Sequence, residues 1–202
     1  MAGRPRSFDR DEALSRALKV FWTKGYADAS MTDLTGAMGI NSPSLYAAFG
    51  SKEDLFREAV RLYTGTAGAA LWASMREVRT AREAIEGLLL ATAAANGQTD
   101  RPKGCLLVLS GAHPDALPEG ACGEVSKIRA DSVATMEERL RDAQMAGEIA
   151  PDADPAAIAA FYTTVQQGMT FRAREGATAE ELVATARAAM LAWDGLAGLR
   201  RS

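Results

Sequence analysis

Hydroxyl groups are concentrated in one short stretch near the amino-terminal end of the chain. Ser42, Ser44 and Tyr46 follow one another at two-residue spacing, and Thr32 lies ten residues earlier. Such groups hydrogen-bond phosphate oxygens and base edges, although hydroxyls discriminate weakly between bases. Lys52 follows at the expected start of a helix, where its ammonium group would favour a phosphate. These residue types indicate contact with duplex DNA.

A pair of short helices around a glycine is predicted to position these hydroxyls. Gly39 can take the positive φ that ends a first helix, for which Ser30 is the expected N-cap. Asn41 or Ser42 then caps a second helix, and Pro43 suits its first turn because proline lacks an N–H that would have no partner there. This pattern is typical of a helix-turn-helix. The alternative is an ordinary helical hairpin inside an all-α core.

The apolar residues of the two helices recur at a spacing of four. Leu34 and Met38 in the first helix, and Leu45 and Phe49 in the second, are therefore predicted to face inward. The outer face of the second helix is small and polar, and it carries Ser42, Ser44, Tyr46 and Ala47. A helix with such a face fits a major groove about 12 Å wide.

The segment GINSPSLYAAFGSKEDLF resembles the signature of the TetR family of bacterial transcriptional regulators, and the match extends over residues 8–58. The residues in family register are Phe21, Gly25, Tyr26, Leu34, Gly39, Leu45, Tyr46, Phe49, Lys52 and Leu55. The resemblance implies a homodimeric repressor, less often an activator, that binds a palindromic operator. A small-molecule effector bound in the C-terminal half would release it.

The resemblance also implies which residues contact the operator. They are Thr32, Ser42, Pro43, Ser44, Tyr46, Ala47 and Lys52. Many relatives carry a large or basic residue after the Leu-Tyr pair, where this chain has Ala47 and Ala48. Because no Arg, Asn or Gln lies in the middle of the second helix, we expect sequence to be read through thymine methyl groups, Thr32, Asn41 and DNA shape.

The remainder of the chain has the apolar spacing of helices. We expect them over residues 9–24, 52–75, 81–95, 124–145 and 179–199, with another opened by Asp154 and Pro155. The run CLLVLS fits a short helix or a strand, and its helical surroundings favour a helix. The predicted fold is all-α, with a three-helix DNA-binding module over residues 1–50 and a larger helical bundle for ligand binding and dimerisation over residues 51–202.

The last two expected helices are rich in Ala, Thr and Gly, which allows helix axes to approach closely. Two copies of this pair would form a four-helix seam between subunits. The alternative is that these helices pack only within one subunit. We also expect the fourth helix to transmit effector binding, because it belongs to both halves of the chain.

The effector pocket that the family resemblance implies lies among the middle helices. Its expected lining is mostly apolar, which favours an uncharged or weakly polar effector. The candidates are Trp72, Met75, Leu88, Thr92, Cys105, Leu106, Met136, Phe161, Tyr162, Val165 and Gln166.

Cys105 has a second interpretation. At the head of a short helix, near Arg101 and Lys103, its thiol could gain thiolate character. The effector would then be an electrophile or an oxidant, and the protein a thiol- or partner-regulated repressor without a small-molecule ligand. The favoured alternative is that Cys105 is a small buried hydrophobe.

Charge is distributed unevenly along the chain. The net charge is −3, but residues 1–24 carry six Lys or Arg and three Asp or Glu, a local net of +3. Arg4 and Arg6 in this tail are predicted to reach phosphates or a minor groove. The alternative is an ordinary terminus without a role.

The remaining composition argues against other classes of protein. Two cysteines, no secretory signal and no long apolar run predict a cytoplasmic protein with no membrane contact. A single histidine, His113, leaves no zinc constellation, so no cofactor is expected. His113 is also the one group suited to general-base catalysis near neutral pH, and no nucleophile pairs with it, so we predict that the protein is not an enzyme.

Overall fold

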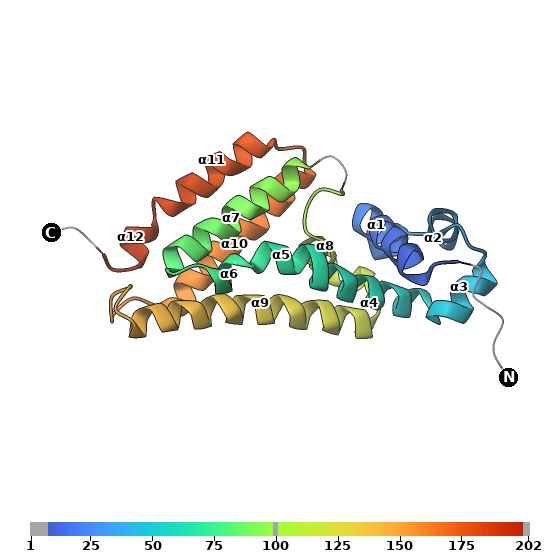
Figure 1. Cartoon of the computed structure of the whole chain (residues 1–202), viewed down its shortest axis with the longest axis horizontal. Coiled ribbons are helices and arrows are strands. Elements are labelled where there is room, and N and C mark those ends of the chain that lie inside the picture. The colour runs from blue at the N-terminus through green and yellow to red at the C-terminus, as the bar shows by residue number, and fades with distance from the viewer. Residues whose placement is uncertain (1–7, 99–100, 200–202) are drawn as a thin grey trace.

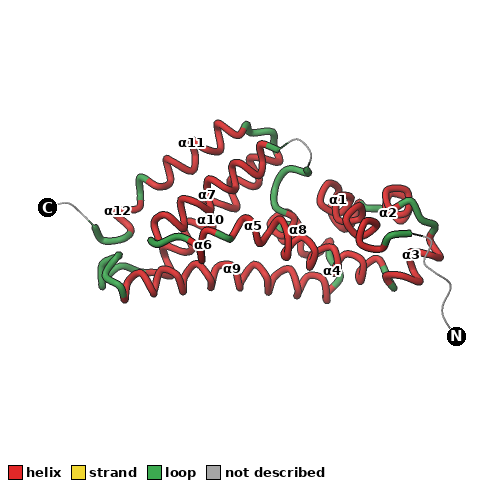
Figure 2. The backbone as a smooth tube through the Cα atoms, in the orientation of Figure 1, coloured by secondary structure: helices red, strands yellow, loops and turns green. Residues whose placement is uncertain are grey.

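The computed structural model describes residues 8–98 and 101–199, and every regular element within these ranges is a helix (Figure 1, Figure 2). The predicted all-α fold is therefore confirmed. The first three helices lie together at one end of the molecule, and we call them the reading module. They are α1 (Arg10–Asp28), α2 (Met31–Met38) and α3 (Ser42–Phe49), and α4 (Lys52–Tyr63) leads from them into the rest of the chain.

Helix α1 is longer than the sequence suggested. Its N-cap is Asp9, whose carboxylate accepts from the backbone N–H groups of Asp11 and Glu12. Gly25 was expected to end the helix, and it does leave helical conformation, with φ of 82°. A last turn then continues to Asp28. Because only glycine adopts this φ readily, the break at Gly25 redirects the chain toward α2.

Helix α4 does not run unbroken to Met75 as expected. A π-helix, η1 (Thr64–Gly68), follows it, and then α5 (Ala69–Trp72) and α6 (Ser74–Glu77). The hydroxyl groups of Thr64 and Thr66 donate to the carbonyl oxygens four residues before them. Such back-bonding bends helices, and the two glycines of η1 weaken the helix further. The segment expected to form one helix is therefore interrupted in its middle by η1.

The second part of the chain, from η1 onward, is the body. Its helix α8 (Leu106–Gly111) confirms the helical interpretation of CLLVLS. The other elements are α7 (Ala81–Gly97), η2 (Pro114–Ala116), α9 (Glu119–Met145), α10 (Pro155–Arg174), α11 (Ala179–Met190) and α12 (Trp193–Leu196). Helix α9 begins five residues before the expected start at residue 124. The helix expected over residues 179–199 is divided into two helices, α11 and α12. Helices α7, α10 and α11 pack beside one another, and α9 runs along the length of the body (Figure 1).

Two buried apolar clusters hold the molecule together. The module core contains the four predicted inward residues of α2 and α3, together with α1, α4, α8 and the first turns of α9. Phe56 lies at its centre, with its ring 5.2 Å from the rings of Phe21 and Tyr26. The body core joins α7, α9, α10, α11 and α12. Helices α8 and α9 of the body also contribute to the module core, whereas the buried residues of α4 all belong to the module core and none to the body core. The domain division at residue 50 stays a prediction.

Candidate nucleic-acid interface

The turn between α2 and α3 has helix-turn-helix geometry. Gly39 ends α2 in the left-handed conformation, with φ of 69°. Asn41, rather than Ser42, caps α3, because its side-chain oxygen accepts from the backbone N–H of Ser44 at 2.9 Å. Pro43 occupies the first turn, where no N–H is needed. These contacts fix the angle at which α3 leaves the turn.

Helix α3 has one buried face and one open face. Leu45 and Phe49 are buried in the module core. On the other side, Tyr46 is 50% exposed. Ser42, Pro43 and Ala47 are also exposed, whereas Ser44 is half-buried. The open face is therefore small and hydroxyl-bearing, and α3 lies near the tip of the molecule (Figure 1).

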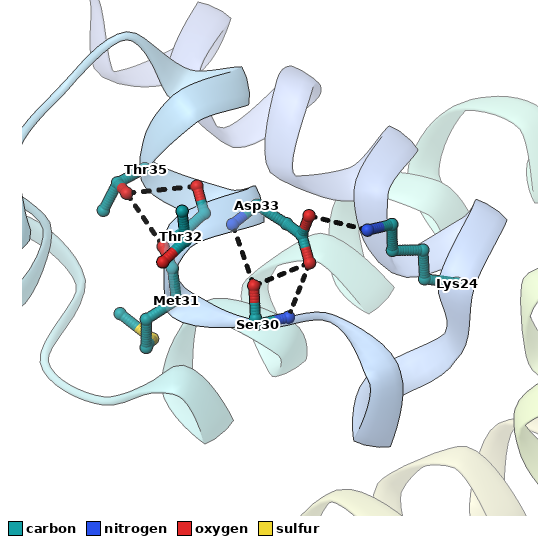
Figure 3. Close-up of polar contacts among 6 residues, drawn as sticks. All are labelled: Lys24, Ser30, Met31, Thr32, Asp33 and Thr35. Carbon is teal, nitrogen blue, oxygen red and sulfur yellow. Dashed lines mark hydrogen bonds and ion pairs between the residues drawn. The ribbon is translucent and has the colours of Figure 1, made fainter.

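The start of α2 is held by a capping box that also ties it to α1 (Figure 3). The Ser30 hydroxyl accepts from the Asp33 backbone N–H at 3.0 Å, and the Asp33 carboxylate accepts from the Ser30 backbone N–H at 3.0 Å. Lys24 Nζ lies 2.6 Å from Asp33 Oδ1. Hydrogen bonds from Lys24 and Ser30 hold the pKa of Asp33 well below its usual value. Thr32, a predicted DNA contact, is exposed beside this cluster.

The ammonium group of Lys52 contacts the end of α1. Its ammonium group lies 4.5 Å from the centre of the Tyr26 ring, and it donates to the carbonyl oxygen of Ala27 at 3.5 Å. Burial lowers the pKa of Lys52, and the nearby Asp28 carboxylate opposes this shift. The predicted phosphate contact would therefore form beside the end of α1. Arg4 and Arg6 lie outside the described residues.

Arg10 positions the far end of α3, a role that the sequence did not reveal. Its guanidinium donates to the carbonyl oxygen of Ala48 at 3.3 Å and to Glu58 Oε1 at 2.7 Å. The same group lies 4.3 Å from the centre of the Phe49 ring. It thus joins α1, α3 and α4. The sequence indicated Arg10 only as positive charge, because its partners are 38 and 48 residues away.

Further contacts attach the reading module to the body. Trp22 Nε1 donates to the carbonyl oxygen of Gly104 at 3.0 Å, and Arg174 donates to the carbonyl oxygen of Thr23. These two bonds span 82 and 151 residues of chain, so no local pattern could have indicated them.

The carboxylate of Glu124 joins α9 to α4. It accepts from Arg57 Nε at 2.6 Å and from Arg61 Nε at 3.0 Å. Burial alone would raise the pKa of Glu124, but the hydrogen bonds from the two arginines lower it. A movement of α9 would therefore be transmitted to α4, whose first turn adjoins α3.

Two of the predicted effector-pocket residues line one cavity. This cavity, which we call the π-helix cavity, has a volume of about 520 Å³ and lies beside η1. Trp72 and Cys105 contribute to its wall, together with Tyr63, Leu71 and Thr135. The charged residues that line it, Arg76, Glu77 and Asp131, are exposed.

The other predicted pocket residues lie elsewhere. Leu106 lines a separate cavity beside the reading module. Four residues are packed within the body core: Met75, Leu88, Met136 and Tyr162. Val165 packs against that core, and Phe161 is partly exposed on α10. Thr92 and Gln166 are buried polar residues, and the Thr92 hydroxyl donates to the carbonyl oxygen of Leu88. The structure does not bring all of these residues to one cavity.

Cys105 and His113 occupy different environments. Cys105 is the N-cap residue of α8 and is buried against Tyr63. Burial raises the pKa of Tyr63 well above its usual value, and the adjacent thiol adds to this shift. Arg101, expected near the thiol, has its guanidinium 4.9 Å from the centre of the Trp22 ring. His113 is exposed immediately before η2, and Asp115 is exposed within η2.

Neither a metal cluster nor a membrane span is found in the part of the chain that the structure describes. No three or more His, Cys, Asp or Glu side chains within residues 8–98 and 101–199 are grouped to hold a metal ion. Over the same ranges, no helix combines the length and apolarity needed to cross a bilayer.

Comparisons with known proteins agree with the helix-turn-helix geometry. Residues 13–59 match the model of bacterial regulatory proteins of the tetR family, and residues 81–190 match that of a tetracyclin repressor-like C-terminal domain. The chain is 35% identical to the HTH-type transcriptional repressor ComR of Escherichia coli (strain K12), over 96% of this chain and 93% of that protein. It is 34% identical to the repressor BdcR of the same organism, over 91% and 88% of the two chains.

A solved structure resembles the whole chain. It is a cysteine mutant of the TetR family transcriptional regulator CifR complexed with 26-bp double-stranded operator DNA, at 42% identity and a TM-score of 0.88, covering 94% of this chain and 100% of that one. These matches are to DNA-binding regulators and to no family of enzymes. This chain therefore belongs to the TetR family of bacterial transcriptional regulators.

Proposed function

We propose that this protein is a homodimeric transcriptional repressor of the cytoplasm that binds a palindromic operator and is released by a small-molecule effector. The open, hydroxyl-bearing face of α3 carries this proposal. The similarity to ComR, BdcR and operator-bound CifR supports it. In a symmetric dimer the two α3 helices would enter successive major grooves about 34–36 Å apart, or a multiple of that distance.

The proposed operator contacts fall into two groups. Tyr46 and Lys52 would bind phosphates, since a phenol and an ammonium group are suited to phosphate oxygens, and the Thr32 hydroxyl would reach a phosphate or a base edge. Ser42, Pro43, Ser44 and Ala47 would lie along base edges, where small side chains permit close approach. Arg4 and Arg6 would extend the footprint toward a minor groove.

The test begins with footprinting of the purified full-length protein on genomic DNA. Tyr46→Ala is expected to abolish binding to the site so identified while helicity and dimerisation persist. Met145→Ala is the control, because Met145 is 80% exposed at the end of α9, far along the chain from α3. Unchanged affinity in Tyr46→Ala would refute the proposed docking of α3.

A salt series tests phosphate recognition separately. The logarithm of the operator association constant should fall with the logarithm of salt concentration, by about 0.9 per neutralised phosphate. Lys52→Ala should flatten this slope by about one unit. Lys127→Ala is the matched control, because Lys127 is exposed on α9 and paired with Asp131. Equal slopes in the wild-type protein, Lys52→Ala and Lys127→Ala would show that Lys52 does not contact a phosphate of the operator.

The outer faces of α10 and α11 support a homodimer. On α10, Ala157, Phe161, Thr164 and Gly168 are exposed at a spacing of three or four residues. Phe161 is 37% exposed, and Leu191, just after α11, is 85% exposed. Small residues beside exposed apolar ones allow two helix pairs to pack as a four-helix seam.

Sedimentation can test this seam. Phe161→Glu is expected to shift the protein from dimer to monomer, because it places a charge within an apolar interface. Met145→Glu, an equally drastic change at a more exposed position, should leave the dimer intact. A dimer that persists in Phe161→Glu would place the subunit contact elsewhere.

The π-helix cavity is the proposed effector site. Its size suits a small molecule, and its charged lining residues are exposed while Tyr63 and Cys105 are buried, so an uncharged or weakly polar effector fits best. An effector beside η1 would displace α4 and with it the reading module. A coupling of about 1 to 3 kcal/mol would change operator affinity by about 5- to 150-fold.

A screen of uncharged small molecules by thermal shift tests this assignment. Ala69→Trp should fill the cavity and remove the shift given by any true effector, because Ala69 lines the cavity. Ala70→Trp is the matched control, since Ala70 is exposed and does not line it. Compounds that still bind the Ala69→Trp protein would act at another site.

A second candidate function is regulation by thiol chemistry, without a noncovalent effector. The observation that favours it is the position of Cys105 in the wall of the same cavity, where a reagent that enters the cavity would meet the thiol. Iodoacetamide should then label Cys105 faster than free cysteine, and oxidation should lower operator affinity except in Cys105→Ser. Slower labelling and unchanged affinity would leave Cys105 as a packed hydrophobe.

A further inference from the structure

A second cavity separates the reading module from the body. It has a volume of about 480 Å³, within the range of small-molecule sites. One wall is the end of α1, from Phe21 to Asp28, and the other is formed by α8, the η2 loop and the end of α10. We call it the inter-module cavity. It shares no lining residue with the π-helix cavity.

Aromatic side chains from both walls define the apolar part of this cavity. Trp22 and Tyr26 contribute from α1, and Phe171 from α10. Phe171 is 39% exposed, although most large apolar side chains of the described chain are buried. Rings in such an arrangement favour a flat aromatic ligand, through offset-stacked or edge-to-face contacts.

One guanidinium in the cavity wall is suited to an anion. Arg174 and Lys24 line the cavity, and Asp28 is the one carboxylate in its wall. Lys24 is already paired with Asp33 at 2.6 Å. Arg174 donates to the carbonyl oxygen of Thr23 and, among the described residues, forms no ion pair. A guanidinium has five N–H donors in a fork that matches a carboxylate, so most of its donors remain available.

We propose that the inter-module cavity binds a small aromatic carboxylate, with the carboxylate on Arg174 and the ring against the aromatic side chains of the two walls. The site is distinct from the α3 face and from the proposed effector site. Because one wall belongs to the reading module and the other to the body, such a ligand contacts both. Its affinity therefore depends on their relative placement, and binding favours whichever placement holds it more tightly.

The experiment is a calorimetric titration of the full chain, without DNA, using 2-naphthoate and its uncharged analogue 2-naphthamide. We expect 2-naphthoate to bind with one saturable site per chain and 2-naphthamide to bind about tenfold more weakly or not at all. The Arg174→Gln substitution should lower the affinity for 2-naphthoate by a similar factor. Arg172→Gln is the matched control, because Arg172 lies on the same helix, pairs with Glu175 and does not line the cavity.

A second variant separates binding from folding, since Arg174 also supports the module through Thr23. Ser110→Trp fills the cavity without changing Arg174, and it should abolish 2-naphthoate binding while the thermal unfolding transition is retained. Absence of saturable 2-naphthoate binding, equal affinity for 2-naphthamide, or full binding by Ser110→Trp would each overturn the proposal. Because no operator is present, these outcomes are independent of whether the protein represses transcription.

Discussion

The reading module and the central part of the body are stabilised in different ways. The three helices of the reading module, and α4 directly after them, each have a side-chain N-cap, supplied by Asp9, Ser30, Asn41 and Ser51. By contrast η1, α5, α6, α8 and α9 have none. A capped helix has a defined start, because the side chain satisfies N–H groups that lack intrahelical partners. The module is thus locally specified, and the centre of the body depends on tertiary packing.

The cavities follow the same division. The π-helix cavity is bounded by η1, α5 and α9, and the inter-module cavity by α8, η2 and the end of the capped helix α10 on its body side. A region that binds an effector has to tolerate movement, whereas a helix that reads DNA has to be held at a fixed angle. The difference between the two regions is what the effector-controlled repressor proposed above would require.

The largest expected difference between the regions is in core packing. Phe56→Ala removes a buried ring that lies against Phe21 and Tyr26, and it should lower the free energy of unfolding by about 3–5 kcal/mol. Trp72→Ala removes a half-buried ring at a cavity wall, and it should cost about 1 kcal/mol. Urea unfolding followed by circular dichroism measures both. Equal losses would show that the cavity wall is as tightly packed as the module core.

Removal of a helix cap should have an intermediate effect. Ser30→Ala deletes the capping box at the start of α2 and should cost about 1 kcal/mol in the free energy of unfolding. Ser126→Ala is the matched control, because Ser126 is exposed inside α9, and it should change little. The same urea series applies, and a cost in Ser30→Ala no larger than in the control would mean that tertiary contacts alone hold α2.

The turn and caps of the module could be predicted because their signals are local. Gly39 and the capping residue Ser30 act within four residues of their partners, and the structure confirms both. The contacts that orient the module could not be predicted. Arg10, Trp22 and Arg174 bond to groups 38 to 151 residues away, and only the folded chain brings these together.

The start of α9 shows a different source of error. The expected helix begins at residue 124, and Gly120 and Gly123, which have low helix propensity, precede it. In the structure α9 begins at Glu119. A Cβ at position 120 would lie 2.7 Å from Glu53 Oε1, the far end of a flexible side chain on α4. Ala121 and Val125 are buried in the module core, so tertiary packing, which local propensity does not register, holds the helix at its start. The cavities likewise depend on how distant helices meet.

The ion pairs between α4 and α9 should contribute less than a cap. Glu124→Gln removes the carboxylate that Arg57 and Arg61 share, and the side chains of the two arginines are 38% and 58% exposed. We expect the free energy of unfolding to fall by about 0.5 kcal/mol, because solvent screens such pairs. The loss should be smaller at high salt. Glu137→Gln, which removes the pair with Arg141 within α9, is the control. A loss of several kcal/mol at Glu124 would make this contact a principal support of the module.

The smallest expected effect is the dependence of the α2 cap on pH. The pKa of Asp33 lies below its unfolded value of about 3.9, so the carboxylate stabilises the fold above that pH. This stabilisation is lost as pH falls through the folded pKa. The gap in unfolding free energy between wild type and Asp33→Asn should therefore be constant above about pH 5 and narrow below about pH 4. Asp142→Asn, exposed on α9, is the control. A gap in Asp33→Asn that does not narrow in acid would mean that the bonds to Ser30 and Lys24 do not depend on the charge of the carboxylate.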